Sequence, residues 1–240
     1  MDLFAWLDQS VFRFFGGFAR RSEALDWLLV VFVDLDLFKG GVIFSLLWLI
    51  WFDLRPGLSE RRALLVHTIV GGMLVGALSR ASQNFLPHRA RPMGGADGFS
   101  PPFGIEPKTV EWMREWSSFP SDHAALYFAL ATGLWLANRC WGTLALAWTL
   151  LVICLPRIYV GLHFPSDILA GAALGIVVML VMARLPRQFT LAKLRFEKTH
   201  SPLFYGAAFL LTIEMAYNFD NLRTIGAQAL RSARMLLAAA

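Results

Sequence analysis

The sequence predicts an all-α fold in which six helices cross a membrane, with an interfacial helix at the N-terminus. Of the 240 residues, 57% are hydrophobic and only 16% are charged, whereas a soluble domain of this size carries about 25% charged residues. The charged residues are bunched, so that long apolar runs lie between them. Nine tryptophans and twenty phenylalanines supply interfacial anchors and apolar bulk. These features disfavour the alternative, a soluble helical bundle.

The N-terminal segment predicts helices that lie in the membrane interface. Residues 1–21 place apolar side chains at helical spacing against polar ones such as Asp8, which is the pattern of an amphipathic interfacial helix. Residues 25–37 are apolar but include Asp26, Asp34 and Asp36. Three carboxylates make a lipid-exposed span costly, so we expect this segment to lie partly in the interface.

Six later segments are apolar enough to be membrane spans. Several are shorter than the roughly 20 residues that an untilted span needs, so flanking residues are expected to complete them. We expect one membrane-embedded domain over 1–240, with 1–37 interfacial and 203–240 forming an additional C-terminal span and tail. The predicted spans are 38–53, 62–84, 120–138, 141–156, 165–185 and 203–219.

The distribution of basic residues indicates an orientation. With six spans, the loops 53–62, 138–141 and 184–202 share one side and hold most of the Lys and Arg residues in loops. The positive-inside rule therefore places them in the cytoplasm and the opposite loops outside. The basic termini oppose this orientation, because they fall on the second side. We expect a multi-pass membrane protein whose loops 85–119 and 156–164 face the non-cytoplasmic side.

Three polar clusters stand at the ends of the apolar segments. They are residues 89–92, 119–123 and 157–167. By the six-span count all three end on the same membrane face, so three arginines, two histidines and a carboxylate can meet there. The modest net charge of +5 is spread along the chain. The sequence has no basic stripe with interleaved aromatics of the kind that binds nucleic acid.

The first chemical prediction is a phosphate site. Arginine guanidinium groups match phosphate oxygens, and Ser121 follows a proline at an expected helix start whose N–H groups favour anions. We expect Arg91, Arg157, Ser121 and the backbone N–H groups near Asp122 and His123 to hold a tetrahedral phosphate and its transition state.

The second prediction is a pair of catalytic histidines. Asp167 follows His163 by four residues across a helix start, where its carboxylate can accept the Nδ1 proton and leave Nε2 free to attack phosphorus. His123 comes from another helix, so it can protonate the leaving oxygen and later accept a proton from water. This chemistry needs no metal and no cofactor. A zinc site remains the chemical alternative, although many arginines nearby disfavour it.

These residues at these spacings resemble the type 2 phosphatidic acid phosphatase family, whose fold is shared with vanadium haloperoxidases. Arg91-Pro92 match its first motif, Pro120, Ser121 and His123 its second, and Arg157, His163 and Asp167 its third. The resemblance spans about residues 62–185. It implies the six-helix fold and a metal-independent phosphatase that forms a phosphohistidine.

The departures from the motifs carry information. Asn84 stands at the position of the motif lysine, so Arg89, or Arg80 one turn earlier, is expected to supply the missing cation. Asp122 replaces a glycine and Pro156 replaces a serine. A Pro-Ser-Asp-His variant looks like the branch acting on undecaprenyl diphosphate, with the carboxylate of Asp122 requiring a partner near an anion.

The resemblance implies hydrolysis of a lipid phosphate or diphosphate, with undecaprenyl diphosphate as the first expectation. Phosphatidic acid, phosphatidylglycerophosphate and lipid A phosphates are the alternatives, as is phosphotransfer to a lipid hydroxyl. A protein of another class, which binds or transports lipid phosphates without cleaving them, remains open. The expected partners are the bilayer and its lipid phosphate, not nucleic acid.

Overall fold

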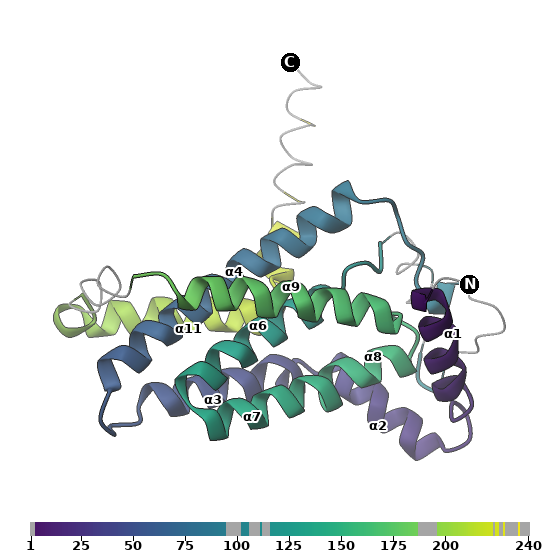
Figure 1. The fold of residues 1–240 in the computed structure, drawn as a ribbon, viewed down its shortest axis with the longest axis horizontal. Coiled ribbons are helices and arrows are strands. Elements are labelled where there is room, and N and C mark those ends of the chain that lie inside the picture. Colours follow the sequence, from purple (N-terminus) through teal and green to yellow (C-terminus); the bar gives the residue numbers. More distant parts are fainter. Residues whose placement is uncertain are drawn as a thin grey trace.

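A computed structural model describes residues 3–94, 102–105, 111, 116–186, 196–222, 224–225, 228 and 235. Within them the chain is helical and has no strand (Figure 1). The first half contains α1 (Leu3–Gly16), α2 (Glu23–Asp34), the π-helical η1 (Leu37–Gly41), α3 (Val42–Trp51), α4 (Leu58–Phe85) and the short η2 (Pro92–Gly94). The second half contains α6 (Asp122–Ala137), α7 (Arg139–Trp148), η3 (Thr149–Cys154), α8 (Leu155–Tyr159), α9 (Pro165–Ala183) and α11 (Ser201–Ala216).

Each of the six predicted apolar segments contains helix. Three helical stretches are long and apolar enough to cross a membrane: Leu58–Phe85, Arg139–Tyr159 and Pro165–Ala183. Leu37–Trp51 and Ser201–Ala216 are apolar but shorter. The protein is a multi-pass membrane protein, while the count of six spans stays a prediction. A helix expected at 110–116 falls largely outside the described residues.

One boundary differs from its prediction in a way that matters for the site. The fourth span was expected to end at residue 156, with Arg157 in the following loop. Instead α7, η3 and α8 run on as one helical stretch to Tyr159, and the π-helical turns of η3 directly before Pro156 accommodate its missing N–H. Arg157 is therefore a helical residue, and it is buried.

Helix α6 lies at the centre, packed against α4 and α9. Two glycines of α9, one turn apart, make the contact unusually close. A Cβ atom at Gly171 would lie 2.3 Å from the Ser121 carbonyl oxygen, and one at Gly175 would lie 2.1 Å from that of Ala125. Small residues allow helix backbones to approach in this way. As a result, the start of α6 lies against the start of α9.

Local capping explains why both helices begin at the motif residues. The Ser121 hydroxyl accepts a hydrogen bond from the Ala124 N–H at 3.3 Å, as an N-cap does. At the start of α9, the Asp167 carboxylate accepts from the Phe164 N–H at 2.7 Å. The Ser121 N–H also donates to the Asp167 carbonyl at 3.1 Å, which fixes one helix start to the other.

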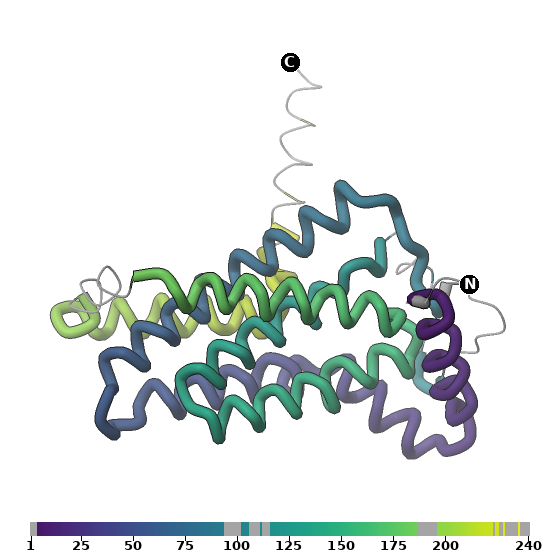
Figure 2. The backbone as a smooth tube through the Cα atoms, viewed as in Figure 1, coloured from purple at the N-terminus to yellow at the C-terminus, as the bar shows by residue number. Residues whose placement is uncertain are grey.

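The N-terminal helix α1 lies across the end of the bundle at which α8 leads into α9 (Figure 2). Its side chains divide by environment: Asp8 is buried, whereas Phe4, Trp6 and Phe14 are exposed. An exposed apolar face opposite a buried polar residue agrees with the prediction that α1 lies in the membrane interface, which stays a prediction.

The chain beyond α11 returns toward α6. The Tyr127 hydroxyl, on α6, donates to the Ala216 carbonyl at 3.1 Å. Asn218 and Phe219 then adopt left-handed backbone conformations, with φ of 50° and 62°. This turn buries Asn218, which is 4% exposed, beside the first turn of α6.

Candidate active site

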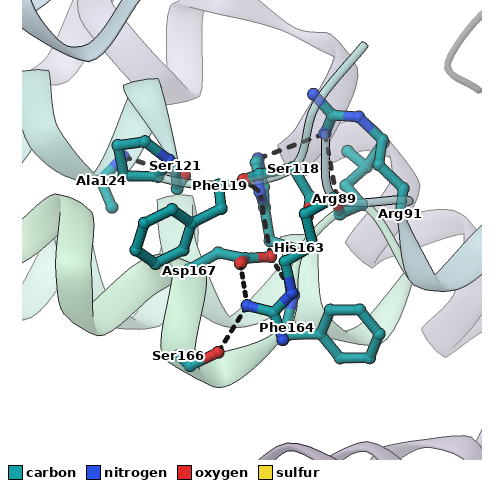
Figure 3. Close-up of polar contacts among 12 residues, drawn as sticks. Arg89, Arg91, Ser118, Phe119, Ser121, Ala124, His163, Phe164, Ser166 and Asp167 are labelled. Atoms are coloured by element: carbon teal, nitrogen blue, oxygen red, sulfur yellow. Dashed lines mark hydrogen bonds and ion pairs between the residues drawn. The ribbon is translucent and has the colours of Figure 1, made fainter. Parts of the chain in front are cut away.

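His163 is held in a defined tautomer. It lies between α8 and α9, is buried, and places Nδ1 2.9 Å from the Ser118 carbonyl oxygen (Figure 3). Because a carbonyl oxygen only accepts, Nδ1 must carry the proton and Nε2 must carry the lone pair. Burial lowers the pKa of His163. The imidazole is therefore neutral at physiological pH, with Nε2 available as a nucleophile.

Asp167 lies beside His163, but the expected hydrogen bond is not the one that forms. Its Oδ2 atom is 3.8 Å from His163 Nδ1, which is longer than a hydrogen bond, and the Nδ1 proton goes to Ser118 instead. The reason is that the carboxylate is already occupied. One oxygen caps α9 through Phe164, and the other accepts from Arg89 at 2.5 Å. Asp167 therefore acts on His163 through its negative charge and not through a hydrogen bond.

Arg91 stands at the free side of the His163 ring. Its Nη1 atom donates to the Leu162 carbonyl at 2.9 Å and lies 3.4 Å from His163 Nε2. Its Nε atom is buried and has no hydrogen-bond partner within the described part of the chain. A buried donor without a partner beside a nucleophilic nitrogen is what binding of an anion at that position requires.

Arg157 is the second predicted phosphate ligand and is almost wholly buried. Its Nη1 atom donates to the Ile153 carbonyl at 2.9 Å, one turn back along the helix. Its charge interacts with those of Arg91 and Asp122. Arg157 also acts electrostatically on His123, as Arg91 does on His163, so each histidine has an arginine nearby.

Arg89 is arranged differently from its predicted role. Its guanidinium donates to the Ser166 hydroxyl at 2.7 Å, to Asp167 at 2.5 Å and to Asp8 at 2.6 Å, and it stacks over the Phe164 ring (Figure 3). Both terminal nitrogens are thereby bound to carboxylates. Arg89 holds Asp167 in place and offers no free terminal nitrogen to a phosphate.

Asp122 also departs from its predicted place in the phosphate site. One carboxylate oxygen lies 2.9 Å from His123 Nδ1 and accepts the His123 N–H at 2.8 Å. The other accepts from Asn218 Nδ2 at 3.0 Å. The His123 N–H, expected to contact phosphate, is thus bound to Asp122, while Ser121 acts as the N-cap of α6.

The cation of the missing motif lysine is not replaced in a simple way. Asn84 is exposed. Arg80 donates to Gln83 at 2.9 Å and packs over the Trp116 ring at 4.0 Å. A buried cation that sequence reasoning did not consider, Lys39 of η1, forms an ion pair with Asp36 at 2.7 Å and interacts electrostatically with Arg157.

Three further contributors were missed from the sequence: Asp8, Ser118 and Asn218. The sequence identified Asp8 only as a polar residue of an amphipathic helix, because its partners lie far along the chain. Ser118 acts through its backbone carbonyl, which no residue type reveals. Among the described residues, no group of three His, Cys, Asp or Glu side chains converges as the ligands of a metal.

Taken together, these features define a helical membrane protein whose site contains a neutral, oriented histidine, the part-buried Arg91, the buried Arg157 and a second histidine. Residues 60–191 match the PAP2 superfamily. Because this is more than half of the chain, the protein belongs to the PAP2 superfamily.

Similar proteins include two curated relatives. The bacitracin transport permease protein BcrC of Bacillus licheniformis is 23% identical over 179 residues, covering 72% of this chain and 78% of that protein. The putative undecaprenyl-diphosphatase YbjG of Escherichia coli (strain K12) is 37% identical over 60 residues, covering 25% of this chain and only 30% of YbjG. A PAP2-type phosphatidylglycerolphosphate phosphatase of Bacillus subtilis superposes with a TM-score of 0.47 at 19% identity, covering 72% of this chain and 83% of that one.

Proposed function

We propose that this protein is a lipid phosphatase that cleaves an isoprenyl diphosphate, undecaprenyl diphosphate being the first candidate, through a phosphohistidine. Membership of the PAP2 superfamily supports a phosphatase. The observation that carries the proposed chemistry is the His163 ring: Nδ1 is bound to the Ser118 carbonyl, and Nε2 faces Arg91 at 3.4 Å.

In the first step, His163 Nε2 attacks the terminal phosphorus. The bond between phosphorus and the bridging oxygen breaks, and His123 gives a proton to that oxygen. Arg91 and Arg157 offset the charge on the equatorial oxygens of the transition state. The products are the lipid monophosphate and an enzyme phosphorylated on His163, whose developing positive charge is countered by Asp167.

In the second step, water attacks the phosphorus of the phosphohistidine. His123 gave up its Nε2 proton in the first step, so Nε2 can now accept a proton from that water. The P–N bond breaks, inorganic phosphate leaves, and both histidines return to their starting states. A lipid hydroxyl in place of water would make the protein a phosphotransferase, so product analysis separates the two reactions.

The substrate assignment is supported by the relative YbjG, whose name gives undecaprenyl diphosphate as its substrate class, and by Asp122 in the second motif. Phosphatidic acid, phosphatidylglycerophosphate and lipid A phosphates use the same chemistry and are the alternatives. The extra phosphate of a diphosphate fits a site with several cations, namely the buried Lys39 and Arg157 and the part-buried Arg91.

We place the active site at the non-cytoplasmic face of a bacterial inner membrane, because the short loops on the opposite side carry more basic residues. We also propose that the reaction is independent of metal. The roles that a metal would serve, charge neutralisation and orientation of the nucleophile, fall to the arginines and to the Ser118 carbonyl.

The deciding experiment is phosphate release by the purified protein in detergent, across undecaprenyl diphosphate, phosphatidic acid, phosphatidylglycerophosphate and lipid A. We expect release from the isoprenyl diphosphate in the presence of EDTA, with His163→Ala inactive. Loss of activity with EDTA and its return with zinc would refute metal independence. Binding of lipid phosphates without release from any of them would identify a binding or transport protein instead.

A further inference from the structure

The residue that departs from the second family motif makes the most specific contacts in the site. Asp122 is buried in the first turn of α6. One of its oxygens accepts both the His123 N–H, at 2.8 Å, and the His123 ring at Nδ1, at 2.9 Å. Because an ionised carboxylate only accepts, Nδ1 donates, and Nε2 is the nitrogen that remains for the substrate.

Asp122 is itself held from another part of the chain. Asn218, in the turn after α11, donates to the second carboxylate oxygen at 3.0 Å and lies 3.5 Å from His123 Nδ1. It is 4% exposed and has a left-handed backbone. The Asn218 amide therefore contacts the carboxylate oxygen of Asp122 that His123 does not, and it does so from a turn beyond the matched family region.

We infer that Asp122 is the positioning residue of the acid/base histidine His123, and that Asn218 holds Asp122 in that position. This inference rests on the proposed function, in which His123 moves the proton. The two histidines then have separate orienting groups: the Ser118 carbonyl for His163 and the Asp122 carboxylate for His123. A glycine at position 122, as in the family motif, has no such group.

The charges around His123 explain why a carboxylate is useful there. Arg157 and Lys39 both act on the His123 ring, and each opposes the imidazolium that exists before the first proton transfer and after the second. Tyr127 packs against the ring without a charge of its own, at 6.2 Å between ring centroids. Asp122 supplies a negative charge that favours the imidazolium against these cations.

The test separates proton transfer from binding. The first step is measured in a single turnover, as the rate of His163 phosphorylation, because the hydrolysis that follows uses His123 with every substrate. Phenyl phosphate releases a basic phenolate that needs the proton, whereas p-nitrophenyl phosphate releases a stable phenolate that does not. We expect Asp122→Asn, which preserves shape but removes charge, to lower the phosphorylation rate with phenyl phosphate by about 100-fold. The rate with p-nitrophenyl phosphate should change far less. Asn218→Ala should lower the rate with phenyl phosphate by about tenfold, in the same pattern.

Asn221→Ala is the matched control, because Asn221 lies three residues further on, is exposed, and donates to Glu214 rather than to Asp122. Thermal unfolding in detergent checks that each variant is folded. Should Asp122→Asn fail to fold, Asn218→Ala retains the carboxylate and carries the test. The inference is overturned if folded variants keep the rate of His163 phosphorylation by phenyl phosphate, or if that rate falls equally with both substrates. An unmodified protein inactive on every phosphate would instead overturn the proposed function.

Discussion

Asp8 accepts two hydrogen bonds from Ser166, one from its backbone N–H at 2.8 Å and one from its hydroxyl at 2.6 Å. The same carboxylate pairs with Arg89 at 2.6 Å, and Arg89 in turn binds Asp167. Asp8 of α1 is thus linked through Arg89 to Asp167, the carboxylate beside the proposed nucleophile.

Asp8→Ala should reduce both stability and activity. The Arg89 side chain is 33% exposed, so removing Asp8 should cost less than the roughly 3–5 kcal/mol of a fully buried pair, and the unfolding temperature in detergent should fall. The loss of support for Arg89 should let Asp167 shift, and small displacements at a catalytic group cost about 100-fold in rate or less. Gln9→Ala is the control, since Gln9 is exposed on the same helix. Equal kcat in Asp8→Ala and the unchanged protein would show that α1 does not support the site.

Substitution of His123 should reveal the covalent intermediate. In His123→Asn, p-nitrophenyl phosphate can still phosphorylate His163, but the water of the second step lacks its base, so the phosphoenzyme should accumulate. The measurement is acid-labile, base-stable incorporation of ³²P after a quench. His163→Ala should take up no label. Label that persists in His163→Ala would place the nucleophile elsewhere.

The pH dependence of the rate should reflect the buried state of His163. Its neutral form is the active one, and burial lowers its pKa from the ordinary value of 6.5. Activity should therefore persist as the pH falls through 6.5 and decline only below it. The profile of kcat/KM should be measured with two substrates whose phosphates ionise differently, because an enzyme group gives the same acid limb with both. A shared limb above pH 6.5 would contradict the assignment.

The close approach of α6 and α9 should tolerate no side chain at Gly171. A Cβ there meets the Ser121 carbonyl oxygen at 2.3 Å, and overpacking typically costs about 1–3 kcal/mol. Gly171→Val should lower the unfolding temperature and, by moving Ser121 away from Asp167, also lower kcat. Ala173→Val places the same side chain on the exposed face of α9 and should leave both unchanged. Equal effects of the two variants would indicate a general intolerance of α9 to valine.

The helices could be predicted from the sequence because their apolar runs are bounded by polar clusters and prolines. The predicted 62–84 and 165–185 correspond to Leu58–Phe85 and Pro165–Ala183. Helix ends were less predictable: Arg157 belongs to α8, because the π-helical η3 lets the helical stretch continue through Pro156. The apolar pattern of a short membrane span is the same as that of a buried helix of 16 residues such as α6. The count of six spans therefore stays a prediction.

The site was predictable where residue type alone determines the role. Motif spacing brought out His163 and Arg91, which the structure places 3.4 Å apart. Pairings between distant residues were not predictable. Nothing in the sequence indicates that Arg89 pairs with Asp8, which lies far away in the chain, so Arg89 was expected to bind phosphate. In the same way, nothing in the sequence connects Asp122 with Asn218, so Asp122 was expected beside phosphate.

The positions of Asp8 and Asn218 have a consequence for biosynthesis. One is contributed by the first described helix and the other by the turn after the last apolar one, so the proposed reaction centre is complete only once the chain has been synthesised past α11. A nascent chain halted after α9 would already hold His163 and Arg91, yet would lack the amide that we propose fixes Asp122. Under the proposed function, a chain truncated before that turn should therefore hydrolyse its substrate more slowly than one that includes Asn218.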